Sequence, residues 1–214
     1  MDSKYFMGVI VPLSVLLPIF IGIIKLKALL PTARIILWYL FVSAILSAAS
    51  VIMGRYFHEN NMPLVHLYTV LEVLLFTWYY KRLSGASKTN VFYIVLPAAF
   101  IVLCIINAVF FQSIYTYSSY TRSVEAIILM MFALSYFAKM ATGNSEKKVG
   151  KQPDFYFNAG IFLYFSGAFM LFIFSNFIAA NLTKHNFLII WNIHAALLLL
   201  MYILFSIAFF KCKK

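Results

Sequence analysis

Charged residues are scarce in this chain, and acidic residues are the scarcest of all. Its 214 residues include six Asp and Glu against 17 Lys and Arg, and hydrophobic residues make up 64% of the total. A soluble domain has about 25% charged residues, since polar side chains must cover its core. The 11% found here is too little for that. We therefore expect an integral membrane protein whose surface lies mostly in lipid.

Cysteine is nearly absent too, with Cys104 in an apolar run and Cys212 in a basic tail. The topology predicted below puts them at opposite ends, which excludes a disulfide between them. A cleaved signal peptide is not expected, because the first apolar run, residues 5–24, is longer than the roughly 7–15 residues of a signal core. No connection between apolar runs exceeds 13 residues, so no soluble domain is expected between them.

Long apolar runs, by contrast, are abundant. Seven of them reach the length of about 17–25 residues with which a helix crosses the hydrocarbon core. Pro31, Pro63 and Pro153 stand at or just before helix starts, where the missing N–H costs nothing. We predict one all-α domain, residues 1–214, that is a bundle of seven transmembrane helices. The helices are expected at residues 5–24, 33–53, 63–80, 91–111, 123–140, 155–180 and 187–210.

The basic residues are distributed unevenly between the two sides of this predicted bundle. Of the 17 Lys and Arg, 13 lie in or beside the first, third and fifth connections or in the C-terminal tail. The positive-inside rule places such connections in the cytoplasm. We therefore predict that the N-terminus is outside and the C-terminus is cytoplasmic. The four basic residues on the outer side are Lys4, Arg55, Arg122 and Lys184.

Polar side chains within the predicted spans gather in the outer half of the membrane. Glu72 lies near the middle of the third span, and Glu125 lies near the outer end of the fifth. Ionisable groups inside a bilayer are costly and point to function. His66, Thr69 and Glu72 follow one another at spacings of three, on one broad helix face. We predict an outward-facing polar pocket lined by His66, Thr69, Glu72, Glu125, Asn176, Asn192 and His194.

Several of these residues also have a purely structural interpretation. Glu72 can be a protonated acid that bonds to a serine, tyrosine or histidine of a neighbouring helix. His194 can serve packing and hydrogen bonding alone. For Arg122 and Glu125, three residues apart at a helix start, we expect a solvated ion pair at the membrane interface.

Some specific chemistries need residues that the spans lack. A retinal protein needs a lysine midway along the seventh helix, and residues 187–210 contain none. Seven-helix zinc-dependent lipid hydrolases need closely spaced histidines on the last helix, whereas His185 and His194 are nine residues apart. A metal site of His66, Glu125 and His194, or a haem between the two histidines, stays open as an alternative. Our leading expectation includes no metal and no cofactor.

In helix count, orientation, size and outward polar cavity, the chain resembles the seven-helix membrane sensor modules of bacterial histidine kinases. The resemblance implies ligand sensing, with a signal passed through the cytoplasmic ends of the helices to a partner. We predict a non-enzymatic sensor or regulatory protein of the bacterial inner membrane, which binds a small molecule, a lipid or a partner segment. The alternatives are an accessory or structural subunit of a larger membrane complex and a membrane-embedded lipid-modifying enzyme.

The expected partners are membrane lipids and a cytoplasmic or membrane protein that contacts the basic inner face. Orientation of the chain is the alternative role of these basic residues. Nucleic acid is not expected, because the basic residues form short clusters between apolar runs and so face the membrane surface. The inner face comprises Lys147, Lys148, Lys151 and the tail 211–214.

Overall fold

The computed structural model describes residues 5–87, 89–142 and 149–213. Seven of its helices are long and apolar enough to cross a membrane, as the sequence predicts. The first span consists of a π-helical turn η1 (Phe6–Ile10), α2 (Val11–Ser14) and α3 (Leu16–Ile24). The others are α4 (Pro31–Arg55), α5 (Met62–Leu83), α6 (Phe92–Phe110), α7 (Ser119–Thr142), α8 (Pro153–Ile173) and α10 (Lys184–Lys211).

Proline marks several of the helix starts, because it lacks only an N–H that the first turn leaves unpaired. Pro31, Pro63 and Pro153 each occupy the first or second position of their helices. Pro12 likewise stands in the first turn of α2, and the first span is interrupted at Val15. The 3-10 turns η2 (Leu26–Ala28) and η3 (Val149–Lys151) precede α4 and α8.

The predicted sixth helix, residues 155–180, is wrong at its far end. Helix α8 ends at Ile173, and a separate short helix, α9 (Ser175–Asn181), follows it. The break falls at Phe174, whose ψ of 4° is not helical. Beside it the hydroxyl of Ser175 donates to the carbonyl of Phe172 at 2.8 Å, a local bond that competes with helix continuation.

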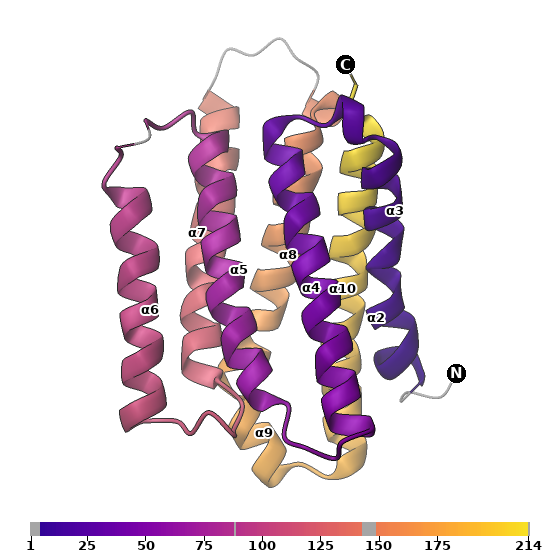
Figure 1. Ribbon diagram of the computed structural model, residues 1–214, viewed down its shortest axis with the longest axis vertical. Coiled ribbons are helices and arrows are strands. Elements are labelled where there is room, and N and C mark those ends of the chain that lie inside the picture. The colour runs from indigo at the N-terminus through magenta and orange to yellow at the C-terminus, as the bar shows by residue number, and fades with distance from the viewer. Residues whose placement is uncertain (1–4, 88, 143–148, 214) are drawn as a thin grey trace.

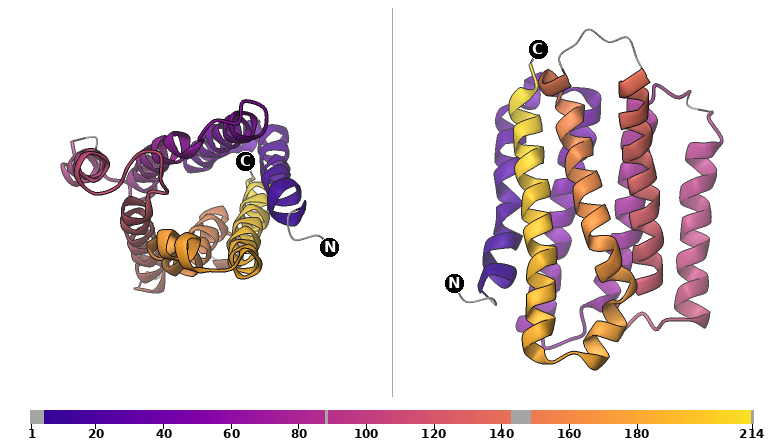
Figure 2. Two further views of the ribbon diagram at one scale, coloured as in Figure 1. Left: turned by 90° about the horizontal axis from the view of Figure 1, so that it is seen from below. Right: turned by 180° about the vertical axis from the view of Figure 1, so that it is seen from behind.

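The spans other than α6 form a ring when the bundle is seen end-on (Figure 2). Going round the ring, α3 contacts α4, α4 contacts α5, α5 contacts α7, α7 contacts α8, α8 contacts α10, and α10 returns to α3. Helix α6 lies outside the ring against α5 and α7, and of its residues only Phe100 and Asn107 are buried. Figure 1 shows the start of the first span and the end of α10 toward opposite ends of the bundle, which we call the N end and the C end.

The half of the bundle toward the C end is filled by aromatic side chains. Phe76, Phe157 and Phe205 are completely buried, and the rings of Phe157 and Phe205 meet edge to face with centroids 5.4 Å apart. A Cβ atom on Gly160 would lie 3.0 Å from the Phe205 ring, so glycine lets α8 and α10 approach closely. This packing brings α8 and α10 into close contact inside the ring.

A small polar network, the C-end cluster of Tyr79, Tyr80, Asp154 and Asn158, is embedded in this apolar half. Tyr79 donates to Asp154 at 3.2 Å, and Tyr80 donates to Asn158 at 2.8 Å. The amide of Asn158 donates in turn to the hydroxyl of Tyr79 at 3.0 Å. These bonds join α5 to α8 and satisfy polar groups that burial would otherwise leave unpaired.

Candidate functional site

The most unusual feature of the N-end half is a buried cluster of three charged side chains. Arg122, in the first turns of α7, donates through Nη1 to Oε2 of Glu72 on α5 at 2.6 Å. The same nitrogen donates to Oε2 of Glu125, one turn further along α7, at 2.8 Å. Arg122 is 5% exposed, Glu72 1% and Glu125 0%. We call these three residues the ion cluster.

The prediction that Arg122 and Glu125 form a solvated pair at the interface is therefore wrong. Their helix start is itself buried, since Ser119, Thr121 and Ser123 are each at most 4% exposed. Asn176 of α9 donates to the carbonyl of Tyr117 at 3.1 Å and to the hydroxyl of Ser119 at 3.2 Å. The first turn of α7 is thus held inside the bundle, where its charges must pair with each other.

Hydrogen bonds and rings fix both sides of the ion pair. Oε1 of Glu72 accepts from the hydroxyls of Tyr39 at 2.8 Å and Tyr68 at 3.0 Å. The guanidinium carbon of Arg122 lies 4.8 Å from the ring centroid of Phe172 and 5.4 Å from that of Tyr68. Cation–π contacts and charge-assisted hydrogen bonds together make this a rigid junction of α4, α5, α7 and α8.

The ion cluster has an unbalanced formal charge. One guanidinium faces two carboxylates, so the three groups carry one net negative charge when all are ionised. An uncompensated buried charge is expensive, and it favours uptake of a proton or of another cation.

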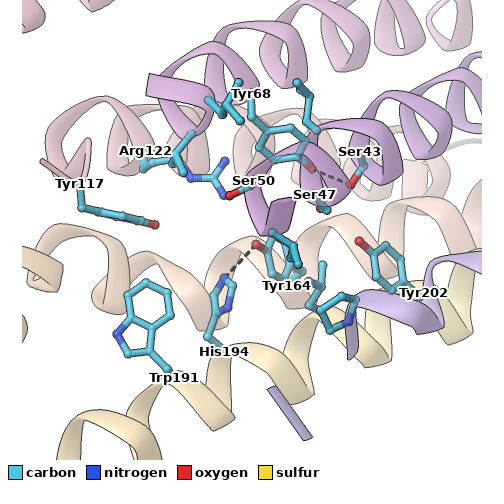
Figure 3. A pocket seen from close by; sticks show the side chains of 16 residues that line it. Ser43, Ser47, Ser50, Tyr68, Tyr117, Arg122, Tyr164, Trp191, His194 and Tyr202 are labelled. Atoms are coloured by element: carbon cyan, nitrogen blue, oxygen red, sulfur yellow. Dashed lines mark hydrogen bonds between the residues drawn. The ribbon is translucent and has the colours of Figure 1, made fainter. Parts of the chain in front are cut away.

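A pocket of about 300 Å³ adjoins the ion cluster in the N-end half of the ring. Arg122 forms part of its wall, together with residues from α2, α4, α5, α8 and α10. In Figure 3 the side chains of Tyr68 and Ser43 face those of Tyr164 and Tyr202 across it. Its polar and aromatic lining residues are Ser43, Ser47, Ser50, Tyr68, Tyr117, Arg122, Tyr164, Trp191, His194 and Tyr202.

Several of the lining groups bond to one another and so hold the walls in place. The hydroxyl of Tyr164 lies 3.0 Å from Nε2 of His194. The hydroxyl of Tyr68 lies within donating distance, 3.3 Å, of Ser43. Burial raises the pKa of Tyr117, and the positive charge of nearby Arg122 partly offsets that effect. The Tyr117 hydroxyl therefore stays protonated at neutral pH and can donate a hydrogen bond.

Three of the seven predicted site residues lie at or directly behind this pocket. His194 lines it. Glu72 and Glu125 do not line it, but both are bonded to Arg122, which does. The ion cluster thus connects predicted residues of two different helices.

The other four predicted residues point elsewhere. Nε2 of His66 lies 3.0 Å from the carbonyl of Thr116, in the connection before α7. Thr69 and Asn192 bond to carbonyls one turn back in their own helices, at 2.9 Å and 2.6 Å. Asn176 holds the start of α7, as described above. Helical spacing places His66, Thr69 and Glu72 on one side of α5, but each bonds a different partner, and Glu72 is the one that bonds Arg122.

The alternative metal site of His66, Glu125 and His194 is not formed. Among residues 5–87, 89–142 and 149–213, no three His, Cys, Asp or Glu side chains come close enough to share an ion. Glu125 instead pairs with Arg122, and His194 pairs with Tyr164.

The tyrosines and serines of the pocket are residues that the sequence analysis did not single out. Ser43, Ser47 and Ser50 follow one another at spacings of four and three, which places them on one face of α4. That spacing is visible in the sequence and could have indicated a polar face of this helix. Tyr68, Tyr164 and Tyr202 gave none, because tyrosine within a span is equally typical of apolar packing and of membrane interfaces.

Basic side chains gather at the opposite, C end of the bundle. Nζ of Lys211 lies 5.0 Å from the ring centroid of Tyr156, and Nζ of Lys25 lies 5.4 Å from that of Phe210. Lys151 and Lys213 are exposed nearby. Lys147, Lys148 and Lys214 of the predicted inner face lie outside the described residues.

Comparison of the chain with protein-family models, with curated proteins and with solved structures gave no match. The pocket and its ion cluster are therefore the features that support a functional proposal.

Proposed function

We propose that this chain is a non-enzymatic sensor of the bacterial inner membrane, which binds a small ligand in the N-end pocket. The observation that carries the proposal is the place of Arg122. It lines the pocket and also holds Glu72 of α5 and Glu125 of α7. A helical bundle in lipid does not need buried charges for its stability, and ionisable groups in such positions generally serve a function.

The proposed orientation has the pocket open to the outside and the basic C end in the cytoplasm. It follows from the distribution of Lys and Arg by the positive-inside rule. A reporter fused after Lys151 should then be active only as a cytoplasmic fusion. A periplasmic signal from that fusion would contradict the orientation.

Helix α5 is the element best placed to carry a signal between the two ends. Tyr68, Glu72, Phe76 and Tyr79 recur along it at spacings of four, four and three, on its face toward the ring interior. The first two belong to the pocket and the ion cluster, and Tyr79 bonds Asp154 of α8 at the C end. A ligand that displaces Tyr68 would therefore act on a helix that is bonded at both ends. The exposed lysines of the C end would then contact a protein partner or anionic lipid.

The test is native mass spectrometry of the protein extracted gently from its own membrane. A reproducible small extra mass should accompany the unsubstituted protein. Ser47→Trp, which fills the pocket from α4, should abolish it. The matched control is Ile45→Trp on the same helix, since Ile45 is 65% exposed and does not line the pocket, and this variant should keep the mass. Absence of the mass from all three proteins, or its retention by Ser47→Trp, would contradict the proposal.

One observation favours a second candidate, an accessory subunit of a larger membrane complex. Helix α6 stands outside the ring and exposes Val95, Val102, Ile105 and Val109, each at least half exposed. Such a face is available to a neighbouring subunit as well as to lipid. A stoichiometric protein partner without a small extra mass, seen in the same experiment, would favour this candidate.

A further inference from the structure

The charge around the pocket restricts what the pocket can hold. Arg122 is the one lining side chain that carries a permanent positive charge, and it faces two carboxylates. Nη1 serves both Glu72 and Glu125, while the guanidinium carbon lies against the rings of Phe172 and Tyr68. Nη1 of Arg122 is therefore already shared between two carboxylates, whereas its Nε has no hydrogen-bond partner in the protein. When both carboxylates are ionised, an anionic ligand would meet the excess negative charge of the ion cluster.

The walls of the pocket are rich in aromatic side chains. Tyr68, Tyr117, Tyr164, Trp191 and Tyr202 bring five aromatic side chains to one small space. The faces of such rings carry negative electrostatic potential and attract organic cations, and tryptophan does so most strongly. Trp191 and Tyr117 stand edge to face with centroids 5.7 Å apart, so the rings offer surfaces in different directions.

We propose that the pocket takes a small organic cation, an ammonium or alkylated ammonium group. This inference rests on the proposed function and names the class of its ligand. The cationic group would lie against the aromatic walls and balance the net negative charge that the ion cluster carries when both carboxylates are ionised. A volume of about 300 Å³ suits a small molecule of this kind.

The experiment compares two probes of the same shape that differ in charge, choline and its uncharged carbon analogue 3,3-dimethylbutan-1-ol. Binding is followed by the fluorescence of Trp191 in a Trp38→Phe, Trp78→Phe background. The chain has three tryptophans, and the two replaced ones are 62% and 45% exposed, away from the pocket. Choline should bind at least about tenfold more tightly than its analogue, through cation–π attraction and the nearby negative charge.

Two sets of variants test whether the preference for choline comes from the charge of the ion cluster and from the aromatic walls. Glu125→Gln removes the unbalanced negative charge and should weaken choline binding about tenfold, with no change for the uncharged analogue. Because a change in a buried cluster can impair folding, a second pair of variants is included. Tyr202→Phe keeps an aromatic ring in the wall and should retain choline binding, whereas Tyr202→Leu should weaken it.

The outcomes separate this inference from the proposed function. Equal affinity for the two probes, tighter binding of the uncharged one, or no binding of either would overturn the cation assignment. If the native small mass is nevertheless lost in Ser47→Trp and kept in Ile45→Trp, the pocket still binds a ligand of another class. If choline is not preferred and the native small mass is also not lost specifically in Ser47→Trp, both proposals are overturned.

Discussion

Arg122 and Glu72 are fifty residues apart in the chain, yet Nη1 of the arginine lies 2.6 Å from Oε2 of the glutamate. This contact joins the start of α7 to the middle of α5, where α5 also bonds α4 through Tyr39. Three helices of the ring are therefore held together at one point. Arg122, which makes this contact, also lines the pocket, so the stability of the N-end half and ligand binding both depend on it.

Removal of the guanidinium alone should be strongly destabilising. Arg122→Met leaves two buried carboxylates without a cation, and loss of one partner from a buried pair costs about 3–5 kcal/mol. The variant with Glu72→Gln and Glu125→Gln added should recover most of that loss, because no charge is then left unpaired. The free energy of unfolding in detergent micelles measures both. A triple variant as unstable as Arg122→Met would show that packing, and not charge, dominates here.

Tyr39 and Tyr68 donate to the same oxygen of Glu72, so their contributions should not be additive. Each single change to Phe removes one bond to a charged acceptor and should cost about 1.5–3 kcal/mol at most. The double variant should lose more than the sum, because Oε1 then has neither tyrosine donor. A double-mutant cycle on unfolding free energy gives the coupling. Simple additivity would contradict the idea of a shared acceptor.

The seven spans were predictable because each is a continuous apolar run bounded by charged or turn-forming residues, as at Pro31 and Pro153. The end of α8 was not predictable in the same way. Neither proline nor glycine stands at Phe174, where the helix breaks, and apolar residues continue through it. Local hydrogen bonding by Ser175 accompanies that break, and hydropathy does not detect it.

The candidate site was predictable only as a set of polar residues, not as an arrangement. Helical spacing shows that Arg122 and Glu125 share a face of α7, but it does not show which neighbour that face meets. The order of helices round the ring decides that Glu72 completes the ion cluster. The start of α7 is buried inside the bundle, so Arg122 and Glu125, expected as a pair at the membrane interface, are buried.

Two glycines of α8 should respond differently to alanine. At Gly160 the new Cβ would lie 3.0 Å from the completely buried ring of Phe205, which has no room to move. At Gly167 it would meet the end of the flexible Leu197 side chain at 2.7 Å, which can rotate away.

Gly160→Ala should therefore lower the free energy of unfolding by about 1–3 kcal/mol, as overpacking does. Gly167→Ala should be close to neutral, since the gain of about 1 kcal/mol in helix propensity offsets the shift of Leu197. Gly54→Ala is the control, because its nearest neighbour would be 3.7 Å away. Equal losses at positions 160 and 167 would contradict the packing described for α8 and α10.

Asn158 should be the most sensitive residue of the C-end cluster, because it is the only member that bonds both tyrosines of the cluster. It accepts from Tyr80 at 2.8 Å and donates to Tyr79 at 3.0 Å. Asn158→Leu has similar size but leaves the buried Tyr80 hydroxyl without its acceptor, which should cost about 1–3 kcal/mol. Adding Tyr80→Phe should restore part of that loss, since the unpaired hydroxyl is removed as well.

The control for Asn158 is Asn181→Ala in α9. Asn181 is exposed and bonds only the carbonyl of Phe177, so its loss should change unfolding by less than about 0.5 kcal/mol. Unfolding in detergent micelles compares the variants directly. If Tyr80→Phe deepens the loss caused by Asn158→Leu, the hydroxyl of Tyr80 has another acceptor, and the cluster does not depend on Asn158. If it restores stability, the bond between Tyr80 and Asn158 is what ties α5 to α8 at the C end, opposite the pocket.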